Sequence, residues 1–545
     1  MLNLLVMKTK LASIVALPLL ALTLGSTAVG CSGAAEDTDA SEDDLTSLTA
    51  RQRELKFSGV VFVEPNASDY TILAAIKKQT QSAFGALREA NVGVNSRELK
   101  DVDPSTFVKT KVKVKNPDVA GDPGVDQLRV SYTFTDSAVV PVPMASRSAL
   151  QLALLRPNYS DSNQRIFDEC TAKDQHAREF MNGSIWYVFD PSLSGCKTAM
   201  AKEQQKIDAD RAKLGSSATV VPQSEANRLY IPVSMALGRI ATSTKTAYPE
   251  YDRLYAGGVE PGKVVIGMVS GMMADWAAGE RHEVFEDQGY EMWYGGLREI
   301  FNARPGFKLT NVEPSTDALK YTVDGKSIVF GSFDDLVKFE LDGKNPAGVT
   351  YANRDKVRAA VANNLAKHWV TFEAPVQVTI KGVTKPVTIK LQSYFGAETD
   401  SAPHKRGIKT SDIFVYNGHS YIGYGPLDPS RFTAADFPKS YQVLMINGCV
   451  SYNYYEKDYK PLKEGGTQNL DLVTNGLESW VNESGESMGR FVGSFIDGKQ
   501  NSYKTILKNS QFTGYGYSWG QDALRVVDGE LDNKYKPSTT PITVR

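Results

Sequence analysis

The chain has 545 residues, of which 41% are hydrophobic and 23% are charged. This is the composition of an ordinary globular protein, and the length leaves room for two or more domains with cores of their own. The net charge is only −2, and no block of lysines and arginines is interleaved with aromatic residues, so a nucleic-acid partner is not expected.

Residues 1–30 are predicted to be an export signal. Two lysines precede an apolar run from Leu11 to Leu24, and small residues lead from there to Cys31. An apolar run of this length is too short to span a bilayer comfortably, and its flanks are those of a removable signal peptide. The mature protein is therefore expected to work outside the cytoplasm.

The signal ends in Ala28-Val29-Gly30-Cys31, which resembles the lipobox of bacterial lipoproteins. The resemblance implies that Cys31 receives a lipid and that this lipid alone holds the protein on the bacterial cell envelope, on the periplasmic side or at the cell surface. The alternative is ordinary signal cleavage after Ala28, which would release a secreted protein. Residues 31–54 begin with a stretch of six acids and no base, and they are expected to form a disordered tether.

Residues 55–250 are expected to form a smaller, N-terminal α+β domain. Strands are predicted at 57–65, 110–115 and 128–135, from an apolar run and from alternation of apolar with other residues. An amphipathic helix is predicted over 71–90. Residues 146–215 are predicted to be mostly helical.

The four cysteines have different expected fates. Cys31 is the expected lipid site. Cys170 and Cys196 are separated by a short polar and aromatic stretch, and in an oxidising compartment they are expected to form a disulfide. Cys449 is left over, and an unpaired thiol in an exported protein is either buried and inert or kept for chemistry.

Residues 255–535 are expected to form a second domain, because glycines and a proline interrupt the pattern at 255–263. The predicted strands lie at 264–272, 326–332, 376–382, 386–395, 413–416 and 443–446. The strands at 376–382 and 386–395 are predicted to form a hairpin. The predicted helices lie at 290–301, at 354–369 with Asn353 as its cap, and around 488–495. Apolar strands that alternate with helices favour a mostly parallel α/β sheet with helices on both faces.

The last two apolar runs end near the two residues best suited to nucleophilic catalysis. One run is followed by Asn417-Gly418-His419, and the other by Asn447-Gly448-Cys449. In an open α/β sheet, ligands bind outside the carboxyl ends of the strands, so neighbouring strands would place both residues at one edge. A thiol needs a base nearby, because the thiolate is the nucleophile and free cysteine is mostly protonated at neutral pH.

A hydrophobic block ending in histidine, followed by a second block ending in cysteine, resembles the caspase-like cysteine peptidases. This group contains the caspase, metacaspase, legumain, clostripain and gingipain families, and its two motifs look like YNGHS and NGCVS in this chain. The resemblance implies that His419 is the general base and acid and that Cys449 is the nucleophile. Gly418, Ser420 and Gly448 would shape the oxyanion hole, with no cofactor and a peptide or protein substrate. Ser420 stands where the family usually has glycine.

Two other catalytic motifs are weaker. Gly418-His419-Ser420 is similar to part of an esterase nucleophile elbow, but the closing glycine is missing and the next residues are too rich in glycine and proline to begin the required helix. Arg281-His282-Glu283 has no second histidine at the spacing of a zinc peptidase, so no metal site is expected. The remaining histidines are expected to be structural: His176, His282, His368 and His404.

The sequence therefore predicts a lipid-anchored cysteine endopeptidase, with an N-terminal α+β domain before a caspase-like α/β domain. The rival hypothesis is a non-catalytic surface lipoprotein with a degenerate peptidase-like fold that binds a partner or a glycan. Ser420 is the feature that favours the rival.

Overall fold

A computed structural model describes residues 45–171, 184–215, 217–241, 245–273, 283–396, 399–479, 484–511 and 523–545. The predicted export signal, Cys31 and most of the predicted tether lie outside the described residues, as do His176 and His282. The described chain is a mixed α/β structure with two large sheets. Residues 50–241, around the first sheet, are called the N-terminal lobe; residues 245–545, with the short strand at 46–47, are called the C-terminal lobe.

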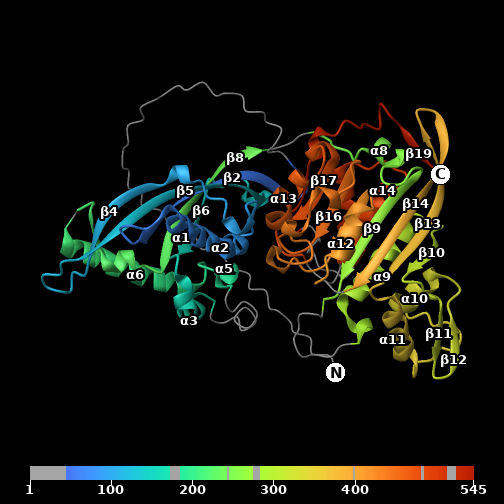
Figure 1. Ribbon diagram of the computed structural model, residues 1–545, viewed down its shortest axis with the longest axis horizontal. Helices are drawn as coiled ribbons and strands as arrows, with labels where there is room; N and C mark the ends of the chain where they lie inside the picture. The colour runs from blue at the N-terminus through green and yellow to red at the C-terminus, as the bar shows by residue number, and fades with distance from the viewer. Residues whose placement is uncertain are drawn as a thin grey trace. The chain divides into compact units, whose positions relative to one another are not determined.

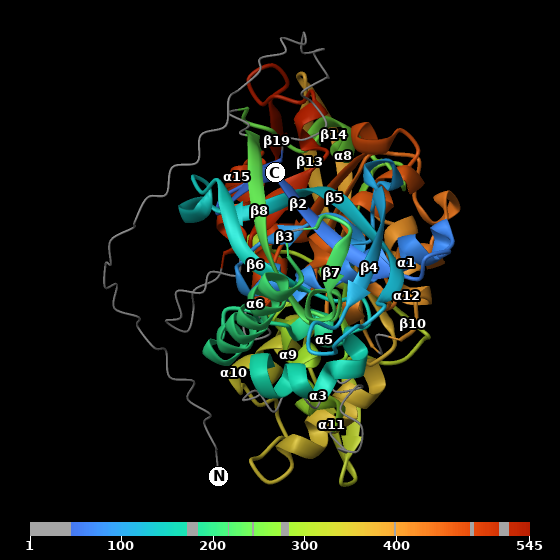
Figure 2. The same ribbon diagram turned by 90° about the vertical axis from the view of Figure 1, so that its left-hand side faces the viewer.

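The N-terminal lobe is built on a seven-stranded sheet in the order β6-β8-β2-β5-β4-β7, with β3 beside β5 (Figures 1 and 2). Its strands are β2 (Ala50–Val63), β3 (Gly93–Val94), β4 (Val108–Lys115), β5 (Val125–Pro141), β6 (Ala149–Leu155), β7 (Val220–Pro222) and β8 (Tyr230–Ala241). Its α-helices are α1 (Asp69–Gln81), α2 (Ala83–Glu89), α3 (Asn163–Ile166), α5 (Ile185–Val188), α6 (Ser194–Leu214) and α7 (Gln223–Ala226). Ile72 and Ile76 of α1 are buried in the same core as Leu55 and Phe57 of β2.

Three sequence predictions need correction in this lobe. The tether was expected to extend to residue 54, but β1 (Thr46–Ser47) already pairs with the C-terminal lobe and β2 begins at Ala50. The predicted helix over 71–90 is broken at Ser82, because its hydroxyl bonds to Gln79 O at 2.5 Å and accepts from the Leu155 N–H at 2.8 Å. Residues 146–215 also contain a strand, β6, which the sequence analysis missed.

The C-terminal lobe contains a ten-stranded sheet whose centre is parallel. The order is β1-β18-β17-β16-β15-β9-β14-β13-β10, with β19 beside β13. Each neighbouring pair in the run from β17 to β14 is parallel, and the pairings outside that run are antiparallel. The sheet is therefore mixed, and the prediction of a mostly parallel sheet was wrong, because hairpin and edge strands extend it on both sides. The strands are β9 (Lys263–Gly271), β10 (Lys308–Glu313), β13 (Trp369–Ile380), β14 (Val383–Gly396), β15 (Ile413–Asn417), β16 (Gln442–Asn447), β17 (Leu470–Asn475), β18 (Arg525–Asp528) and β19 (Ile542–Val544); β11 (Lys320–Val323) and β12 (Lys326–Val329) form a separate hairpin.

Helices and short helical turns cover both faces of the parallel strands. Ile413 and Val415 of β15 point into one core, which contains residues of α9 and α14, whereas Phe414 and Tyr416 point into the other core. This alternation is what a strand buried on both faces produces. The α-helices of this lobe are α8 (Tyr251–Ala256), α9 (Gln288–Ala303), α10 (Phe333–Asp342), α11 (Arg354–Leu365), α12 (Ala402–Lys409), α13 (Lys457–Tyr459), α14 (Ser484–Ile496) and α15 (Tyr503–Ser510).

Most of the predicted elements of this lobe are confirmed, with local differences. The helix predicted over 354–369 ends at Leu365, and the strand predicted to begin at residue 376 begins at Trp369. Asn353 precedes α11, but its side chain makes no cap bond; it accepts from the Thr350 N–H at 2.7 Å instead. The predicted hairpin of β13 and β14 turns over Lys381 and Gly382, both at positive φ, which is tighter than the four-residue turn that the sequence indicated.

The two lobes share one continuous core. Val450 and Tyr454 of the C-terminal lobe are buried in the same cluster as Phe84 and Trp186 of the N-terminal lobe. Asn453 adds polar contacts across the junction, because its amide donates to the main-chain oxygens of residues 94 and 96, at 3.1 and 2.5 Å. In the described part of the chain, no helix has the length and apolar character needed to cross a membrane.

Candidate active site

His419 and Cys449 lie two residues beyond a matched pair on neighbouring parallel strands. β15 and β16 are hydrogen-bonded to each other, and their register pairs Asn417 with Asn447. Both residues therefore emerge at the carboxyl edge of the sheet, where ligands of open α/β sheets bind. The structure thus brings the two predicted catalytic residues to one edge, from adjacent strands.

The two loops that carry these residues touch each other at Gly448. A Cβ atom at this position would lie 2.4 Å from the Ser420 Oγ and 3.2 Å from the Gly418 main-chain oxygen. A side chain at this position would require the Ser420 hydroxyl to turn away and the Gly418 main chain to shift. The three residues that were predicted to shape the oxyanion hole are therefore in mutual contact.

The main chain beyond each loop adopts strained conformations. Val450, directly after Cys449, has φ +52°, and Tyr421 and Ile422, shortly after His419, have φ +48° and +54°. A β-branched residue in the left-handed region is a genuine outlier, and such strain concentrates where surrounding structure holds a functional geometry. The Val450 N–H donates to Leu477 O at 2.9 Å, which fixes the turn that follows the cysteine.

A ladder of buried asparagines supports both loops from below. Asn475 ends β17, and its amide donates to the Asn447 side-chain oxygen at 2.9 Å and to Gly448 O at 3.3 Å. The Asn447 amide in turn donates to the Asn417 side-chain oxygen at 2.8 Å. Arg525 of β18 is 2% exposed and donates to the side-chain oxygens of both Asn447 and Asn475, at 2.9 and 3.0 Å. We call these four residues the asparagine ladder.

The sequence analysis missed this ladder, although a signal for it was present. Three neighbouring strands end in Asn-Gly, at 417–418, 447–448 and 475–476, and only the first two were considered. No sequence pattern marks Arg525 as a member of the ladder, because it reaches the asparagines through the antiparallel pairing of β18 with β17.

Cys449 lies, partly exposed, against the first core cluster. Its sulfur lies 3.8 Å from Ser479 O and 4.0 Å from Ser479 Oγ, and among the described residues this serine, not His419, is its hydrogen-bonding neighbour. The pKa of the thiol is raised, first by burial and then by the negative charge of Glu478; Ser479 and Arg88 act in the opposite direction. Arg88 pairs with Glu478, so an N-terminal-lobe residue belongs to the surroundings of the sulfur.

His419 is half-buried and lies near the start of α9. Its ring meets the ring of Tyr421 edge to face, with 5.7 Å between centroids. The pKa of the imidazole is lowered, chiefly by burial; a hydrogen bond with the Met273 main chain and the charge of Asp287 raise it in part. Asp287 caps α9 by accepting from the Gly289 N–H at 2.7 Å, and the sequence analysis did not single it out. The imidazole is thus neutral at neutral pH, the form that a general base requires.

Ser420 does not have the setting of an esterase nucleophile. The residue is 4% exposed, and only a short 3-10 turn, Tyr421–Gly423, follows it where a nucleophile elbow needs a helix. The Tyr455 hydroxyl donates to the Ser420 main-chain oxygen at 3.1 Å and holds the loop in place. Ser420 is therefore part of the frame between the two loops.

A cavity of about 490 Å³ adjoins the loop that follows His419. Tyr421, Ile422 and Tyr424 line one side of it, and residues of α1, including Lys77 and Lys78, line the other. Its volume falls in the usual range for ligand sites. The N-terminal lobe thus contributes a wall to a cavity that begins two residues from the predicted base.

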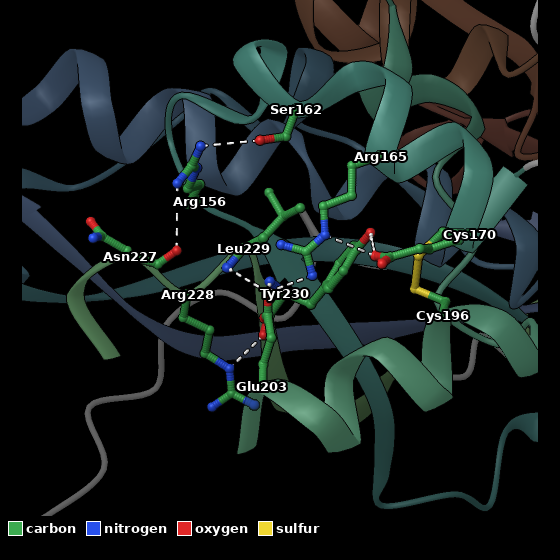
Figure 3. Close-up of polar contacts among 11 residues, drawn as sticks. Arg156, Ser162, Arg165, Cys170, Cys196, Glu203, Asn227, Arg228, Leu229 and Tyr230 are labelled. Carbon is green, nitrogen blue, oxygen red and sulfur yellow. Dashed lines mark hydrogen bonds and ion pairs between the residues drawn. A yellow bond between two sulfur atoms is a disulfide. The ribbon is translucent and has the colours of Figure 1, made fainter. Parts of the chain in front are cut away.

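The predicted disulfide and the histidines that were expected to be structural have settings of their own. Cys170 and Cys196 form the predicted disulfide, which joins the segment after α3 to the first turn of α6 (Figure 3). His404 is buried in α12, with its ring 5.1 Å from that of Tyr416, and His368 bonds to Ala366 O at 2.9 Å. Within the described ranges, no three histidine, cysteine or acidic side chains gather in a way that would hold a metal ion.

Comparison with models of protein families, with curated proteins and with solved structures finds no match for this chain.

Proposed function

We propose that this protein is a cysteine endopeptidase that cleaves peptide bonds through Cys449 and His419, on a chain anchored at the bacterial cell envelope through Cys31. The observation that carries the proposal is the register of β15 and β16, which places a histidine and the unpaired cysteine at equivalent positions on one sheet edge. The contact of both loops at Gly448 and the ladder beneath them supply the rigid support that a catalytic pair needs.

The chemistry is acyl transfer to sulfur followed by hydrolysis. His419 takes the proton of the Cys449 thiol as the sulfur attacks the carbonyl carbon of the substrate, and main-chain amides of the two loops stabilise the oxyanion. When the C–N bond breaks, the imidazolium returns this proton to the leaving amine. Water then attacks the thioester, with His419 moving one proton from the water to the sulfur, and the acid product leaves.

The electrostatics of the site support this division of roles. The lowered pKa of His419 keeps the imidazole neutral and able to accept a proton, whereas the raised pKa of Cys449 keeps the thiol protonated until a base removes the proton. Engagement requires the sulfur, which rests against Ser479, to come within hydrogen-bond reach of the His419 ring. The cavity beside the histidine loop is a candidate site for the substrate.

The experiment is thiol labelling combined with peptide hydrolysis. The full chain is treated with iodoacetamide, the labelled residue is identified by peptide mass, and hydrolysis of fluorescein-labelled casein is measured on the same preparations. Cys449→Ala is expected to abolish hydrolysis, and His419→Ala is expected to lower it by roughly 10²- to 10⁴-fold and to slow labelling of Cys449. His368→Ala is the matched control, because the ring of His368 forms a hydrogen bond with the main chain of Ala366 and belongs to neither of the two loops. Labelling that is slow and indifferent to His419 would overturn the proposal.

The alternative function is non-catalytic binding, and one observation favours it. The sulfur of Cys449 rests against Ser479 and its pKa is raised, which is also the state of an inert, structural cysteine. If the protein is a non-catalytic binder, neither the wild type nor any variant hydrolyses casein. Cys449→Ala would then leave both the fold and the binding properties unchanged.

The anchor is tested independently of the catalytic pair. Cys31→Ser is expected to lose the added mass of the lipid and to move the protein from the membrane fraction to the soluble fraction. Unchanged mass and unchanged fractionation would exclude lipidation at Cys31 and leave the peptidase proposal as it stands.

A further inference from the structure

A second cavity, of about 410 Å³, lies in the N-terminal lobe where two strands part. β8 pairs with β2 only over Ala236–Ala241, whereas its first half, Tyr230–Ala236, pairs with β6. The later residues of β2 are therefore not covered by β8, and Val60, Val61 and Phe62 line the cavity that results, together with Ile231 of β8. We call this the fork cavity.

Three arginines line the fork cavity, and none of them has a carboxylate within ion-pair distance in the described part of the chain. Arg156 donates to Ser162 Oγ at 3.1 Å and to Asn227 O at 3.4 Å, and Arg228 donates to Tyr230 O at 2.6 Å (Figure 3). Arg129 of β5 is the third. Among the described residues, Arg156 and Arg228 thus have hydrogen-bond acceptors that are neutral, and no carboxylate pairs with them directly.

The one carboxylate in the lining is already engaged elsewhere. Glu225 forms an ion pair with Arg211 of α6 at 2.5 Å. Burial lowers the pKa of Arg228 from its ordinary value, and this effect outweighs the nearby charges of Glu203, Glu225 and Asp208, which raise it. The Arg228 guanidinium group is thus partly desolvated, and no carboxylate of the described residues lies in direct contact with it, so an anionic ligand would stabilise it.

Buried donors without an acceptor point to the same kind of ligand. Within the described residues, Arg156 Nε, Arg228 Nη2 and Gln79 Nε2 are buried and have no hydrogen-bond partner. Gln79 is fully buried in α1, and its orientation is fixed because its side-chain oxygen accepts from the Tyr132 hydroxyl at 2.9 Å. Its NH₂ group is therefore held as a donor at the wall of the fork cavity.

We propose that the fork cavity is a binding site for a ligand that carries a carboxylate or phosphate group. The planar guanidinium groups of Arg129, Arg156 and Arg228 match the geometry of both oxyanions, and the Gln79 amide adds a neutral donor. Val61, Phe62, Pro157 and Ile231 offer apolar contact to the rest of the ligand. This site is separate from the catalytic edge and does not depend on the proposed peptidase activity.

The test uses the full chain and two simple anions. Sodium phosphate and sodium succinate are titrated by calorimetry and by thermal unfolding, each against sodium chloride at equal ionic strength. At least one of the two anions is expected to bind saturably and to raise the melting temperature above the chloride reference. A response to phosphate alone, to succinate alone or to both identifies the group that the site takes, and each supports the proposal.

Arg129→Gln is the most informative variant, because the Arg129 side chain makes no hydrogen bond or ion pair with any described residue and its replacement is therefore expected to leave the fold intact. It is expected to weaken anion binding roughly tenfold, and Arg228→Gln at least as much. Arg147→Gln, an exposed arginine of the same lobe, is the matched control and is expected to change nothing. The proposal is overturned if neither anion exceeds chloride, or if Arg129→Gln and Arg147→Gln bind alike.

Discussion

The side-chain amide of Asn447 donates a 2.8 Å hydrogen bond to the side-chain oxygen of Asn417. These two residues are paired in the register of β15 and β16, and each stands two positions before one member of the proposed catalytic pair. The bond therefore fixes the relative position of the two strand ends at the point where the loops leave the sheet.

Asn447→Ala is expected to lower the free energy of unfolding by about 3 kcal/mol, because it removes one hydrogen bond from each of the buried side chains of Asn417, Asn475 and Arg525. Urea denaturation measures the change. The exposed Asn311 of β10 provides the control, since Asn311→Ala is expected to stay within about 0.5 kcal/mol of the wild type. Equal effects of the two substitutions would show that the ladder contributes nothing specific.

Glu478→Gln is expected to speed labelling of Cys449 at a fixed pH below the thiol pKa. The charge of Glu478 raises this pKa, so its removal lowers the pKa and increases the fraction of thiolate. Arg88→Gln is expected to act in the opposite direction, because Arg88 lowers the same pKa. Rates of iodoacetamide reaction across a pH series check both signs, and Glu464→Gln, at an exposed site, serves as the control. A shift in the same direction for both variants would contradict the prediction.

His404 is expected to make the protein less stable in mild acid. Burial lowers the pKa of the folded-state imidazole to about 4, from an ordinary value of 6.5. Between pH 4 and pH 6.5 the unfolded chain therefore binds a proton at this histidine, whereas the folded chain does not. The free energy of unfolding is not reduced by His404 above pH 6.5, and it falls as the pH decreases from 6.5 toward 4.

The size of this effect is roughly 3 kcal/mol, and His404→Phe is expected to remove it. The measurement is the unfolding free energy of both proteins between pH 4 and 7. Parallel curves for the variant and the wild type would show that His404 does not titrate in this way.

Removal of the disulfide is expected to destabilise the N-terminal lobe. The bond closes a loop with a sequence separation of 26 residues, and the loss of this constraint on the unfolded chain corresponds to about 3 kcal/mol. Cys170→Ala/Cys196→Ala is compared with the wild type under oxidising and reducing conditions. The wild type alone is expected to lose stability on reduction, and a double variant that is also sensitive to the reductant would contradict the assignment.

The two lobes are expected to unfold in a single transition. Val450 and Tyr454 share a core with Phe84 and Trp186, so separation of the lobes would expose apolar surface on both sides. Calorimetry of the full chain is expected to show one cooperative transition, and a fragment of residues 245–545 is expected to lack one. Two separate transitions in the full chain would instead indicate independent domains.

Local pattern was enough to predict several parts of this protein. The apolar runs at 413–416 and 443–446 are β-strands, they are parallel neighbours, and the residues after them meet at one edge. The disulfide of Cys170 with Cys196 also followed from cysteine number and the expected compartment. These predictions depend on short stretches of chain, where hydrophobic period and residue chemistry act directly on the backbone.

Other features were decided only by tertiary structure. The pair of Arg88 with Glu478 joins residues 390 positions apart, and it determines part of the charge around Cys449. Arg525 reaches the asparagine ladder only because β18 pairs with β17, and the arginines of the fork cavity meet only because β8 leaves β2. The sequence alone determined which groups are available for chemistry and at which strand ends they stand. Which charges and donors surround them depends on contacts between distant segments, and these form only when the whole chain packs.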